Sequence, residues 1–451
     1  MRISRHLWTW LLVLLCLNGK AADGHVILIT IDGFPASAWK DPKTSIPTLR
    51  ALAQQGVSAE GMRISNPAMT WPNHTTLVTG RRAKQHSVLF NGIMTRSTTG
   101  VMSVDGKKDK ADLVQAPTLF DLAHRAGQRT AAINWPCTRN SGTLDDDFPD
   151  VPQNLFHTTP RLKQELVAKG VLENATDESF SALSGPARDT VWKEAACHVI
   201  RTRKPHFLLL HLLNTDSTHH KYGPGSPASY TALTLADYYI RDVLTALDDA
   251  GIRDRTTLFI VADHGFAMAD KAILPNFLLK QAGLLETTPA GVILRTRAQV
   301  VPEGGTGMIY FTQPSTRDED RKKVLELLTG QEGIAAILTP DHFAELGLPT
   351  PQENSGMADL LLVAKDGYGV SGLASGSDYV QPTGGAVNAG YHGYLSSNPK
   401  MNALFIAAGR GIRRQAPIGL IDNTEVAPTI AKLLGLSLDK ADGQVLSQIL
   451  E

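Results

Sequence analysis

The sequence contains only three cysteines in 451 residues, and this scarcity limits the metal chemistry that it can support. Cys16 lies in an apolar N-terminal stretch, so Cys137 and Cys197 are the two that remain for the folded part. Two thiolates are too few for a zinc site built from three or four cysteines. A metal site in this chain must therefore use histidine and carboxylate ligands. The sequence does not decide whether the two cysteines form a disulfide.

An excess of charge of either sign is also absent. The 44 basic and 44 acidic side chains cancel, so the chain lacks the positive field that holds a nucleic-acid polymer. With 42% hydrophobic and 20% charged residues, the composition is typical of an ordered globular protein. We therefore expect a small-molecule substrate, and an anionic one must be held by local groups rather than by net charge.

The sequence also has no apolar run as long as the roughly 20 residues of a membrane-spanning helix. The N-terminal run, from Leu7 to Leu17, follows early positive charges and precedes the small residues Ala21 and Ala22. This order is typical of a secretory signal peptide. We predict that residues 1–22 are a signal peptide, that no stable membrane span remains after its removal, and that the protein is exported to a periplasm or secreted.

Strand and helix patterns alternate along most of the chain. The apolar runs HVILITI, QRTAAINW, FLLLHLLN, TTLFIVAD and NALFIAAG predict buried strands, and residues 46–56, 116–127, 229–251 and 423–435 predict helices. Such alternation predicts an α/β fold with a doubly wound, mostly parallel sheet. Between residues 284 and 385 the pattern changes to that of a small α+β insertion. We therefore assign residues 23–283 and 386–451 to the core.

Three of the predicted strands lead into aspartates. Asp32 follows VILITI, Asp216 comes shortly after FLLLHLLN, and Asp263 follows LFIVA. In open α/β sheets, ligands bind at the carboxyl ends of the strands. A single aspartate there more often caps a loop, but three of them predict a site.

Histidines accompany these aspartates. His220 lies four residues after Asp216, His264 directly follows Asp263, and His392 lies in AGYHGY, beyond the predicted insertion. Three carboxylates and three imidazoles are enough ligands for two zinc ions. Manganese is an alternative, because carboxylate and imidazole ligands accept both metals.

The stretch AMTWPNHTTLVTG contains a candidate nucleophile, Thr70. A threonine hydroxyl is a weak nucleophile at neutral pH and needs activation. Pro72 predicts a helix that begins just after Thr70 and contributes its positive end. A metal ion would have the larger effect on the pKa of the hydroxyl.

The order of IDGF, TWPNHTTLVTG, DSTHHKYGP, ADHG and GYHGY resembles the alkaline phosphatase superfamily and, within it, the nucleotide pyrophosphatase/phosphodiesterase family. The resemblance extends from about His25 to the C-terminus and implies an alkaline phosphatase-like fold. It further implies two zinc ions per chain, with the ligands divided into two sets. The first set is Asp32, Thr70, Asp263 and His264, and the second is Asp216, His220 and His392.

The same resemblance implies hydrolysis of a phosphodiester or pyrophosphate bond. Thr70 attacks phosphorus in line and forms a phosphothreonine intermediate, while Asn91 donates to a phosphoryl oxygen. Two further residues are implied to contact substrate. His211 stands where nucleotide-cleaving members usually have a tyrosine that packs on the base, and Trp135 belongs to a segment that resembles the family's Trp-Pro-Gly stretch.

Other activities stay open from the sequence. A phosphonate hydrolase of the same superfamily would keep the seven ligands and would need basic residues for a substrate carboxylate. A monoester-specific phosphatase would need a magnesium site and a phosphate-clamping arginine, which we do not find in the pattern. A sulfatase would need cysteine or serine at the position of Thr70. If the chain were a non-catalytic binding protein, we would expect at least one metal ligand or the nucleophile to be replaced. None of these positions is replaced.

Overall fold

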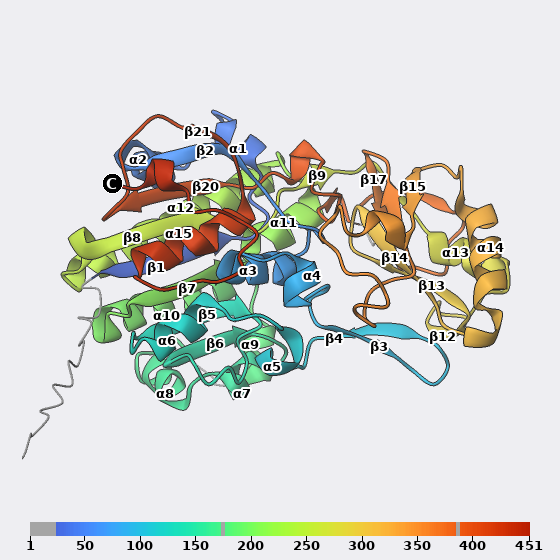
Figure 1. Cartoon of the computed structure of the whole chain (residues 1–451), viewed down its shortest axis with the longest axis horizontal. Coiled ribbons are helices and arrows are strands. Elements are labelled where there is room, and N and C mark those ends of the chain that lie inside the picture. Colours follow the sequence, from blue (N-terminus) through green and yellow to red (C-terminus); the bar gives the residue numbers. More distant parts are fainter. Residues whose placement is uncertain (1–23, 173–175, 385–387) are drawn as a thin grey trace, which may run out of the picture.

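The computed structural model describes residues 24–172, 176–384 and 388–451, so the predicted signal peptide lies outside the described residues. Its largest element is an eight-stranded sheet (Figure 1). The strand order is β21 (Ile418–Asp422), β2 (Val57–Arg63), β20 (Phe405–Gly409), β8 (Thr256–Val261), β1 (His25–Ile31), β7 (Phe207–Leu212), β5 (Thr130–Pro136) and β6 (Asp146–Asp150). Only β20 runs against the others in this sheet. The predicted doubly wound, mostly parallel sheet is therefore confirmed.

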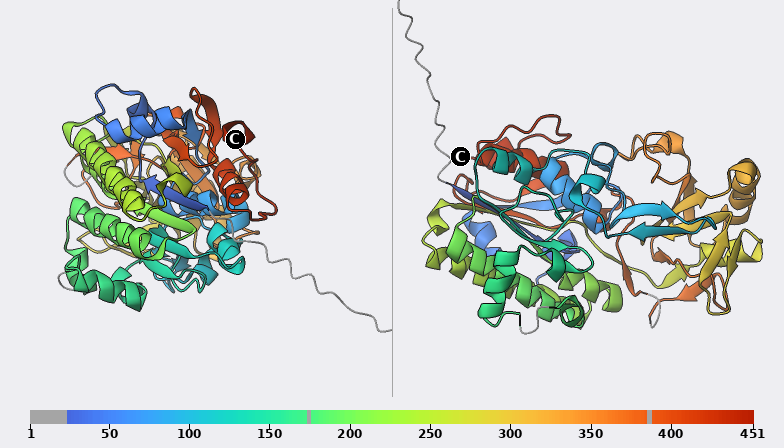
Figure 2. Two further views of the ribbon diagram at one scale, coloured as in Figure 1. Left: turned by 90° about the vertical axis from the view of Figure 1, so that its left-hand side faces the viewer. Right: turned by 90° about the horizontal axis from the view of Figure 1, so that it is seen from below.

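Helices cover both faces of this sheet (Figures 1 and 2). One layer consists of α2 (Pro47–Gln55), α10 (Gly185–Arg203) and α12 (Pro227–Asp249), and the other of α3 (Thr70–Thr79), α6 (Leu119–Arg125) and α15 (Val426–Leu433). In α12, the buried side chains Leu233, Ala236, Ile240, Val243 and Leu247 recur at helical spacing and pack into the main hydrophobic core. Because helices cover both faces, the central strands β1, β7 and β8 are buried along their whole length.

A second, smaller body extends from the core (Figure 1, orange). It contains an antiparallel sheet of β13 (Ala298–Pro302), β14 (Thr306–Phe311), β16 (Leu360–Ala364) and β15 (Ile334–Leu338), with α13 (Pro275–Gln281) and α14 (Arg317–Leu328) beside it. Its hydrophobic cluster also includes Ile273 and Leu279, which precede residue 284. The body thus has its own core, and this core uses side chains from before the predicted insertion.

Smaller sheets complete the fold. They are β10 (Lys271–Ile273) with β17 (Tyr368–Val370) and β18 (Val380–Pro382), β11 (Leu285–Thr287) with β12 (Ile293–Thr296), β3 (Ile93–Arg96) with β4 (Met102–Asp105), and β9 (Ala267–Met268) with β19 (Gly390–Tyr391). The other α-helices are α1 (Ala36–Lys40), α4 (Ala83–His86), α5 (Lys110–Leu113), α7 (Asn154–His157), α8 (Pro160–Ala168), α9 (Asp177–Ser181) and α11 (Asn214–Tyr222).

Two further findings concern the cysteines and the membrane. Cys137 and Cys197 are both buried free thiols, so they are not joined to each other. Within the described ranges, no helix combines the length and the apolar character that crossing a bilayer requires.

Candidate functional site

The three predicted aspartates lie at the carboxyl edge of three neighbouring strands. Asp32 directly follows β1, and β1 lies between β7 and β8 in the sheet. Asp263 and His264 follow β8, whereas Asp216 and His220 lie on α11, the helix that comes after β7. Because the three strands are parallel, their carboxyl ends meet at one place.

His392 reaches this place through a short antiparallel ladder. Strand β19 pairs with β9, which follows His264 closely in the chain, and Tyr391 lies opposite Ala267. The ladder places the His392 ring on the His264 ring, with centroids 3.9 Å apart and an interplanar angle of 15°. The two imidazoles therefore meet although 128 residues separate them in sequence, from position 264 to position 392.

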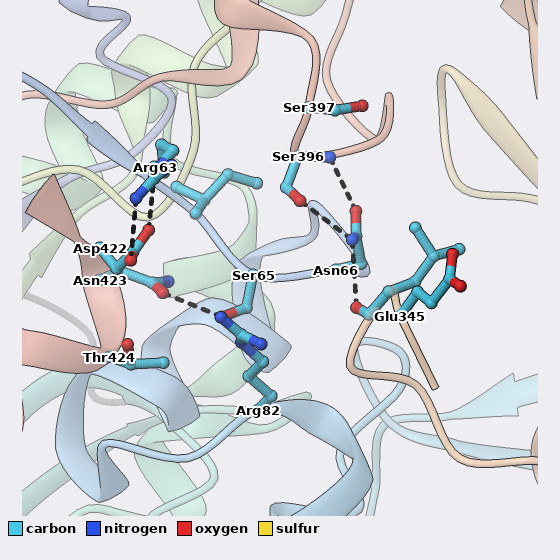
Figure 3. A pocket seen from close by; sticks show the side chains of 12 residues that line it. Arg63, Ser65, Asn66, Arg82, Glu345, Ser396, Ser397, Asp422, Asn423 and Thr424 are labelled. Atoms are coloured by element: carbon cyan, nitrogen blue, oxygen red, sulfur yellow. Dashed lines mark hydrogen bonds and ion pairs between the residues drawn. The ribbon is translucent and has the colours of Figure 1, made fainter. Parts of the chain in front are cut away.

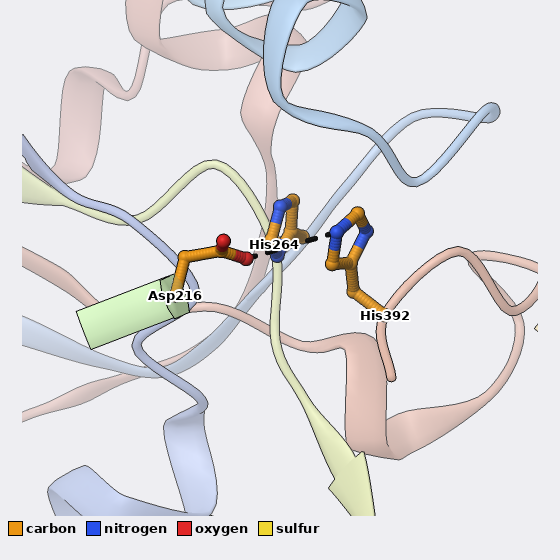
Figure 4. Close-up of side chains that lie close together, drawn as sticks. All are labelled: Asp216, His264 and His392. Carbon is orange, nitrogen blue, oxygen red and sulfur yellow. Dashed lines mark ion pairs between the residues drawn. The ribbon is translucent and has the colours of Figure 1, made fainter. Parts of the chain in front are cut away.

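The predicted ligands form two groups that share His264. In the first, His264 Nε2 lies 3.4 Å from Asp32 Oδ1 and 3.2 Å from Asp263 Oδ2. In the second, Asp216, His264 and His392 point toward one another (Figure 4). In each group the ligand atoms lie within 4.8 Å of one another. His220 Nε2 is 3.4 Å from Asp216 Oδ1, which brings it beside the second group.

Several buried atoms in these groups have no hydrogen-bond partner among the described residues. They are Asp32 Oδ1, Asp216 Oδ1, Asp263 Oδ2 and His264 Nε2. A buried polar atom without a partner costs free energy, and such atoms are rare in folded proteins. Carboxylate oxygens and an imidazole nitrogen that face one another in this way fit divalent cations of the zinc type.

The histidines of the site are held by backbone carbonyls. The Nδ1 atoms of His220, His264 and His392 lie 3.1, 3.1 and 2.7 Å from the carbonyl oxygens of Gly390, Gly265 and Ala68. A carbonyl oxygen can only accept, so Nδ1 carries the proton in His264 and His392 and Nε2 keeps its lone pair, whereas Nδ1 of His220 also lies 3.2 Å from Asn388 Nδ2. This arrangement is typical of metal-binding histidines.

The electrostatics of the groups also favour a cation. Burial, and then the charges of Asp263 and Asp216, raise the pKa of Asp32 well above its ordinary value. Burial raises the pKa of Asp263 to about 7 and lowers that of His264 to about 4. For Asp216, the imidazoles of His220 and His392 outweigh the effect of burial and lower the pKa. A bound cation would relieve the repulsion among the carboxylates, and burial lowers the pKa of His264 and His392, which leaves these two imidazoles free to coordinate it.

Thr70 is the first residue of α3, which begins at this residue rather than after it. The Asn73 side chain fixes the turn before it, since Asn73 Nδ2 donates to the carbonyls of Pro67 and Met69 at 2.9 and 3.0 Å. His74 Nδ1 donates to the Thr70 carbonyl at 2.8 Å. No described side chain is hydrogen-bonded to the Thr70 hydroxyl, so a general base does not activate it in this conformation.

Asn91 lies beside Thr70. Its Oδ1 accepts from the backbone N–H of Trp71 at 2.9 Å, which fixes the amide so that its NH₂ group is the end left to donate. Thr70 and Asn91 line one cavity of about 520 Å³ together with Asp216, His220 and His392. The cavity thus joins the candidate nucleophile, a hydrogen-bond donor and part of the ligand set.

Two acids in this cavity were missed by sequence reasoning. Asp150 ends β6, whose sequence DDFPD does not resemble a strand because aspartate and proline are rare in strands. Glu303 lies in the turn between β13 and β14. Neither residue lies in a pattern that marks a site, and only the pairing of distant segments reveals them.

The two residues predicted to contact substrate, His211 and Trp135, are fully buried and are not among the residues that line the cavity. His211 Nε2 lies 2.8 Å from Asp32 Oδ2, and its Nδ1 lies 2.9 Å from the Asn134 carbonyl. Trp135 packs edge-on against His74, with ring centroids 4.7 Å apart. His211 therefore orients the carboxylate of Asp32, and Trp135 supports α3 from below.

A second cavity, of about 310 Å³, contains none of the predicted site residues (Figure 3). Its lining includes Arg63 of β2, Asp422 of β21, Arg82 directly before α4, and Glu345 of the smaller body. Arg63 pairs with Asp422 at 2.8 Å. Two arginines are thus balanced by two acids, and the cavity has no net charge that would select an ion.

Comparisons with known proteins agree with this geometry. A model of the family described as type I phosphodiesterase / nucleotide pyrophosphatase matches residues 26–395. The chain is 23% identical to ectonucleotide pyrophosphatase/phosphodiesterase family member 3 of Bos taurus over 424 residues, covering 91% of this chain and 42% of that protein. It is 24% identical to venom phosphodiesterase of Naja atra over 421 residues, covering 91% and 44%. The chain spans less than half the length of these curated relatives.

Solved structures show the same fold. Human ectonucleotide pyrophosphatase / phosphodiesterase 5 superposes with a TM-score of 0.72 at 18% identity, covering 95% of this chain and 100% of that one. The murine protein, solved in an inactive form in complex with AMP, gives a TM-score of 0.71 at 18% identity with the same coverage. The fold is thus that of the family to which the matching model belongs.

Proposed function

The chain belongs to the type I phosphodiesterase / nucleotide pyrophosphatase family, and from this membership we propose that it hydrolyses phosphodiester or pyrophosphate bonds with Thr70 as nucleophile. Two zinc ions are its cofactors, and manganese is an alternative for the same ligands. The observation that carries the proposal is the set of buried, unpartnered atoms on Asp32, Asp216, Asp263 and His264, which lie beside Thr70 at one edge of the sheet.

In this proposal the ligands divide as the sequence predicts. Asp32, Asp263 and His264 hold one ion together with Thr70, and Asp216, His220 and His392 hold the other. When bound, the two cations stabilise negative charge on the phosphoryl oxygens and favour ionisation of the threonine hydroxyl.

The residues of the chain then perform the following steps. The Thr70 hydroxyl gives its proton to solvent water, and its Oγ1 attacks phosphorus in line with the outgoing oxygen. The Oγ1–P bond forms while the bond from phosphorus to the outgoing oxygen breaks, which leaves a phosphothreonine and an outgoing group that takes a proton from solvent. A water molecule then attacks phosphorus and loses one proton to solvent, the Oγ1–P bond breaks, and Oγ1 takes up a proton to restore the hydroxyl. The Asn91 amide donates to a phosphoryl oxygen in both steps, and the N-terminus of α3 adds positive potential at Thr70.

The residues that line the cavity argue against the alternative activities. A phosphonate hydrolase for a carboxylate-bearing substrate would need basic residues, and no lysine or arginine is among the described residues that line the cavity. A non-catalytic binding protein has little use for an intact threonine beside a full set of ligands.

We also propose that the protein is exported, on the basis of the signal-peptide pattern in residues 1–22.

The test measures hydrolysis of bis-p-nitrophenyl phosphate beside p-nitrophenyl phosphate by the purified protein. The diester should be cleaved much faster than the monoester, and a chelator should abolish the activity until zinc is restored. Thr70→Ala should lose it while still binding metal. Thr231→Ala, which removes an exposed threonine of α12, serves as the control and should keep it. Protein that holds two metal ions and cleaves neither ester would overturn the proposal.

A further inference from the structure

The catalytic cavity contains acids that the proposed chemistry does not use. Besides the proposed ligands, its wall includes the carboxyl groups of Asp150 and Glu303, and no lysine or arginine is among its described lining residues. In the proposed chemistry, the metal ligands and Asn91 already account for the binding of the substrate phosphate. The two additional acids therefore act on another part of the substrate.

Asp150 is held in a fixed position beside the nucleophile. The indole N–H of Trp71 donates to Asp150 Oδ2 at 3.1 Å, and Trp71 directly follows Thr70 in α3. Among the described residues, no group donates a hydrogen bond to Asp150 Oδ1. One carboxylate oxygen is therefore anchored to the catalytic helix, and the other is left to accept a hydrogen bond from a ligand.

Glu303 comes from the smaller body and reaches the same cavity. Its side chain is 2% exposed, and its Oε1 has no hydrogen-bond partner among the described residues. Its Oε2 has only a long contact of 3.4 Å with the Thr306 hydroxyl. The turn is fixed against the catalytic core, since the Gly305 N–H donates to the His392 carbonyl at 2.8 Å. An unpartnered buried carboxyl in a cavity wall indicates that a ligand completes its hydrogen bonding.

The cation whose charge acts on Asp150 is Arg188, on α10. It does not line the cavity. The rest of the wall combines polar side chains, among them Asn91 and Asn388, with apolar ones such as Trp71 and Val370. An anionic group of the substrate would meet carboxyl groups and apolar surface here, without a positive partner in the wall.

We propose that this cavity selects phosphodiesters in which one ester arm carries an ammonium or hydroxyl group, with Asp150 as the residue that receives this group and Glu303 as the second acid of the subsite. An arm that carries a carboxylate or a further phosphate is disfavoured. The proposal rests on the proposed phosphodiesterase function and deepens it, because it assigns a substrate class to the same site. It separates this chain from an enzyme specialised for pyrophosphate bonds, whose substrates place additional negative charge beside the reacting phosphorus.

The test uses three esters that share one leaving group and one arm length. They are p-nitrophenyl 2-aminoethyl phosphate, p-nitrophenyl 2-hydroxyethyl phosphate and p-nitrophenyl 2-carboxyethyl phosphate. Because p-nitrophenolate leaves in each case, differences in kcat/KM report on the charge of the arm. We expect the amino ester to be cleaved fastest and the carboxy ester slowest, with about a tenfold or larger ratio between the two, since charges a few ångströms apart near a protein surface interact at that level.

Substitutions of the two acids test which residue causes the preference for the amino ester. Asp150→Asn should reduce the ratio of amino to carboxy ester by about tenfold, because it removes the charge and keeps the shape. Glu303→Gln should reduce it in the same direction but by less, since burial raises the pKa of Glu303 to about 8 and the substitution removes little charge at neutral pH. Asp318→Asn, which removes an exposed acid on α14 far from the cavity lining, is the matched control and should keep the wild-type ratio.

The outcomes separate the two proposals. Failure of zinc-loaded protein to cleave any of the three esters overturns the proposed function, and this inference with it. Cleavage of all three at equal rates, or fastest cleavage of the carboxy ester, overturns the inference and leaves the function intact. Preference for the carboxy ester that is lost in Arg188→Gln would identify Arg188 as the true anchor and would equally refute the role of Asp150.

Discussion

The position of Thr70, the proposed nucleophile, depends on His74, a buried histidine that is not a proposed ligand. Its Nδ1 donates to the Thr70 carbonyl at 2.8 Å, and its Nε2 lies 2.8 Å from the Thr30 hydroxyl of β1. Burial lowers the pKa of His74 well below its ordinary value, so the ring is neutral and Nε2 accepts from Thr30. His74 thus connects the first residue of α3 to the centre of the sheet.

Two substitutions separate these hydrogen bonds. In His74→Asn the amide nitrogen occupies approximately the place of Nδ1 and keeps the bond to Thr70, whereas in His74→Gln the amide reaches the place of Nε2 and keeps the bond to Thr30. Each variant loses one buried hydrogen bond and leaves one partner unsatisfied, which costs about 1–3 kcal/mol of unfolding free energy. The stability loss should therefore be similar in the two.

The effect on activity should differ. Loss of the Thr70 contact frees the nucleophile, and a displacement of about 1 Å at a reacting group lowers the rate by about 100-fold. We expect kcat for bis-p-nitrophenyl phosphate to fall about 10- to 100-fold in His74→Gln and only a few-fold in His74→Asn. Urea unfolding and zinc content, measured on the same preparations, exclude loss of fold or metal. Equal loss of kcat in both variants, or no loss in either, would refute the reasoning.

Three further predictions concern other parts of the chain. Burial raises the pKa of Asp147 to about 8 from 3.8, so the folded state binds this proton more tightly and the free energy of unfolding falls as pH rises from about 4 to about 8, by up to about 1.4 kcal/mol per pH unit. Asp147→Asn should flatten this slope in urea unfolding of zinc-loaded protein, and an unchanged slope would contradict the assignment. Gly393 has a φ of 76°, and a Cβ there would lie 1.5 Å from the Glu303 carbonyl oxygen, so Gly393→Ala should displace His392 and lower zinc content toward one equivalent after dialysis. Gly251→Ala, with a φ of 64° and no atom within 4 Å of the added Cβ, is its control and should retain both zinc equivalents. Asn91→Ala should lower kcat by about 100-fold with zinc content unchanged, as measured by diester hydrolysis and metal analysis, and a change confined to KM would argue against a role in the transition state.

Much of the fold could be predicted because its signals are local. Continuous apolar runs bounded by turn residues marked β1, β7 and β8, and helical spacing marked α12. The acidic strand β6 could not be predicted, since its residues form a strand only through pairing with β5. The reversed direction of β20 likewise depends on its partners rather than on its own sequence.

The predicted ligands rested on residue type, order and family resemblance. No such signal tells where His211 and Trp135 lie, because a buried central strand shows no alternation that would indicate which face a side chain occupies. His211 lies opposite Thr30 in the register of β7 with β1, and this pairing directs it into the core against Asp32. Trp135 is fully buried against His74 of α3.

The sequence by itself determined the family and the class of fold and predicted the metal-ligating side chains, since each of these depends on residue type and order along a short segment. Only the tertiary structure decided which side chains share a cavity. The smaller body places Glu303 at the site, β6 places Asp150 beside Trp71, and the β9–β19 ladder places His392 on His264. These contacts join segments far apart in the chain, and sheet register and the packing of one body on another set them.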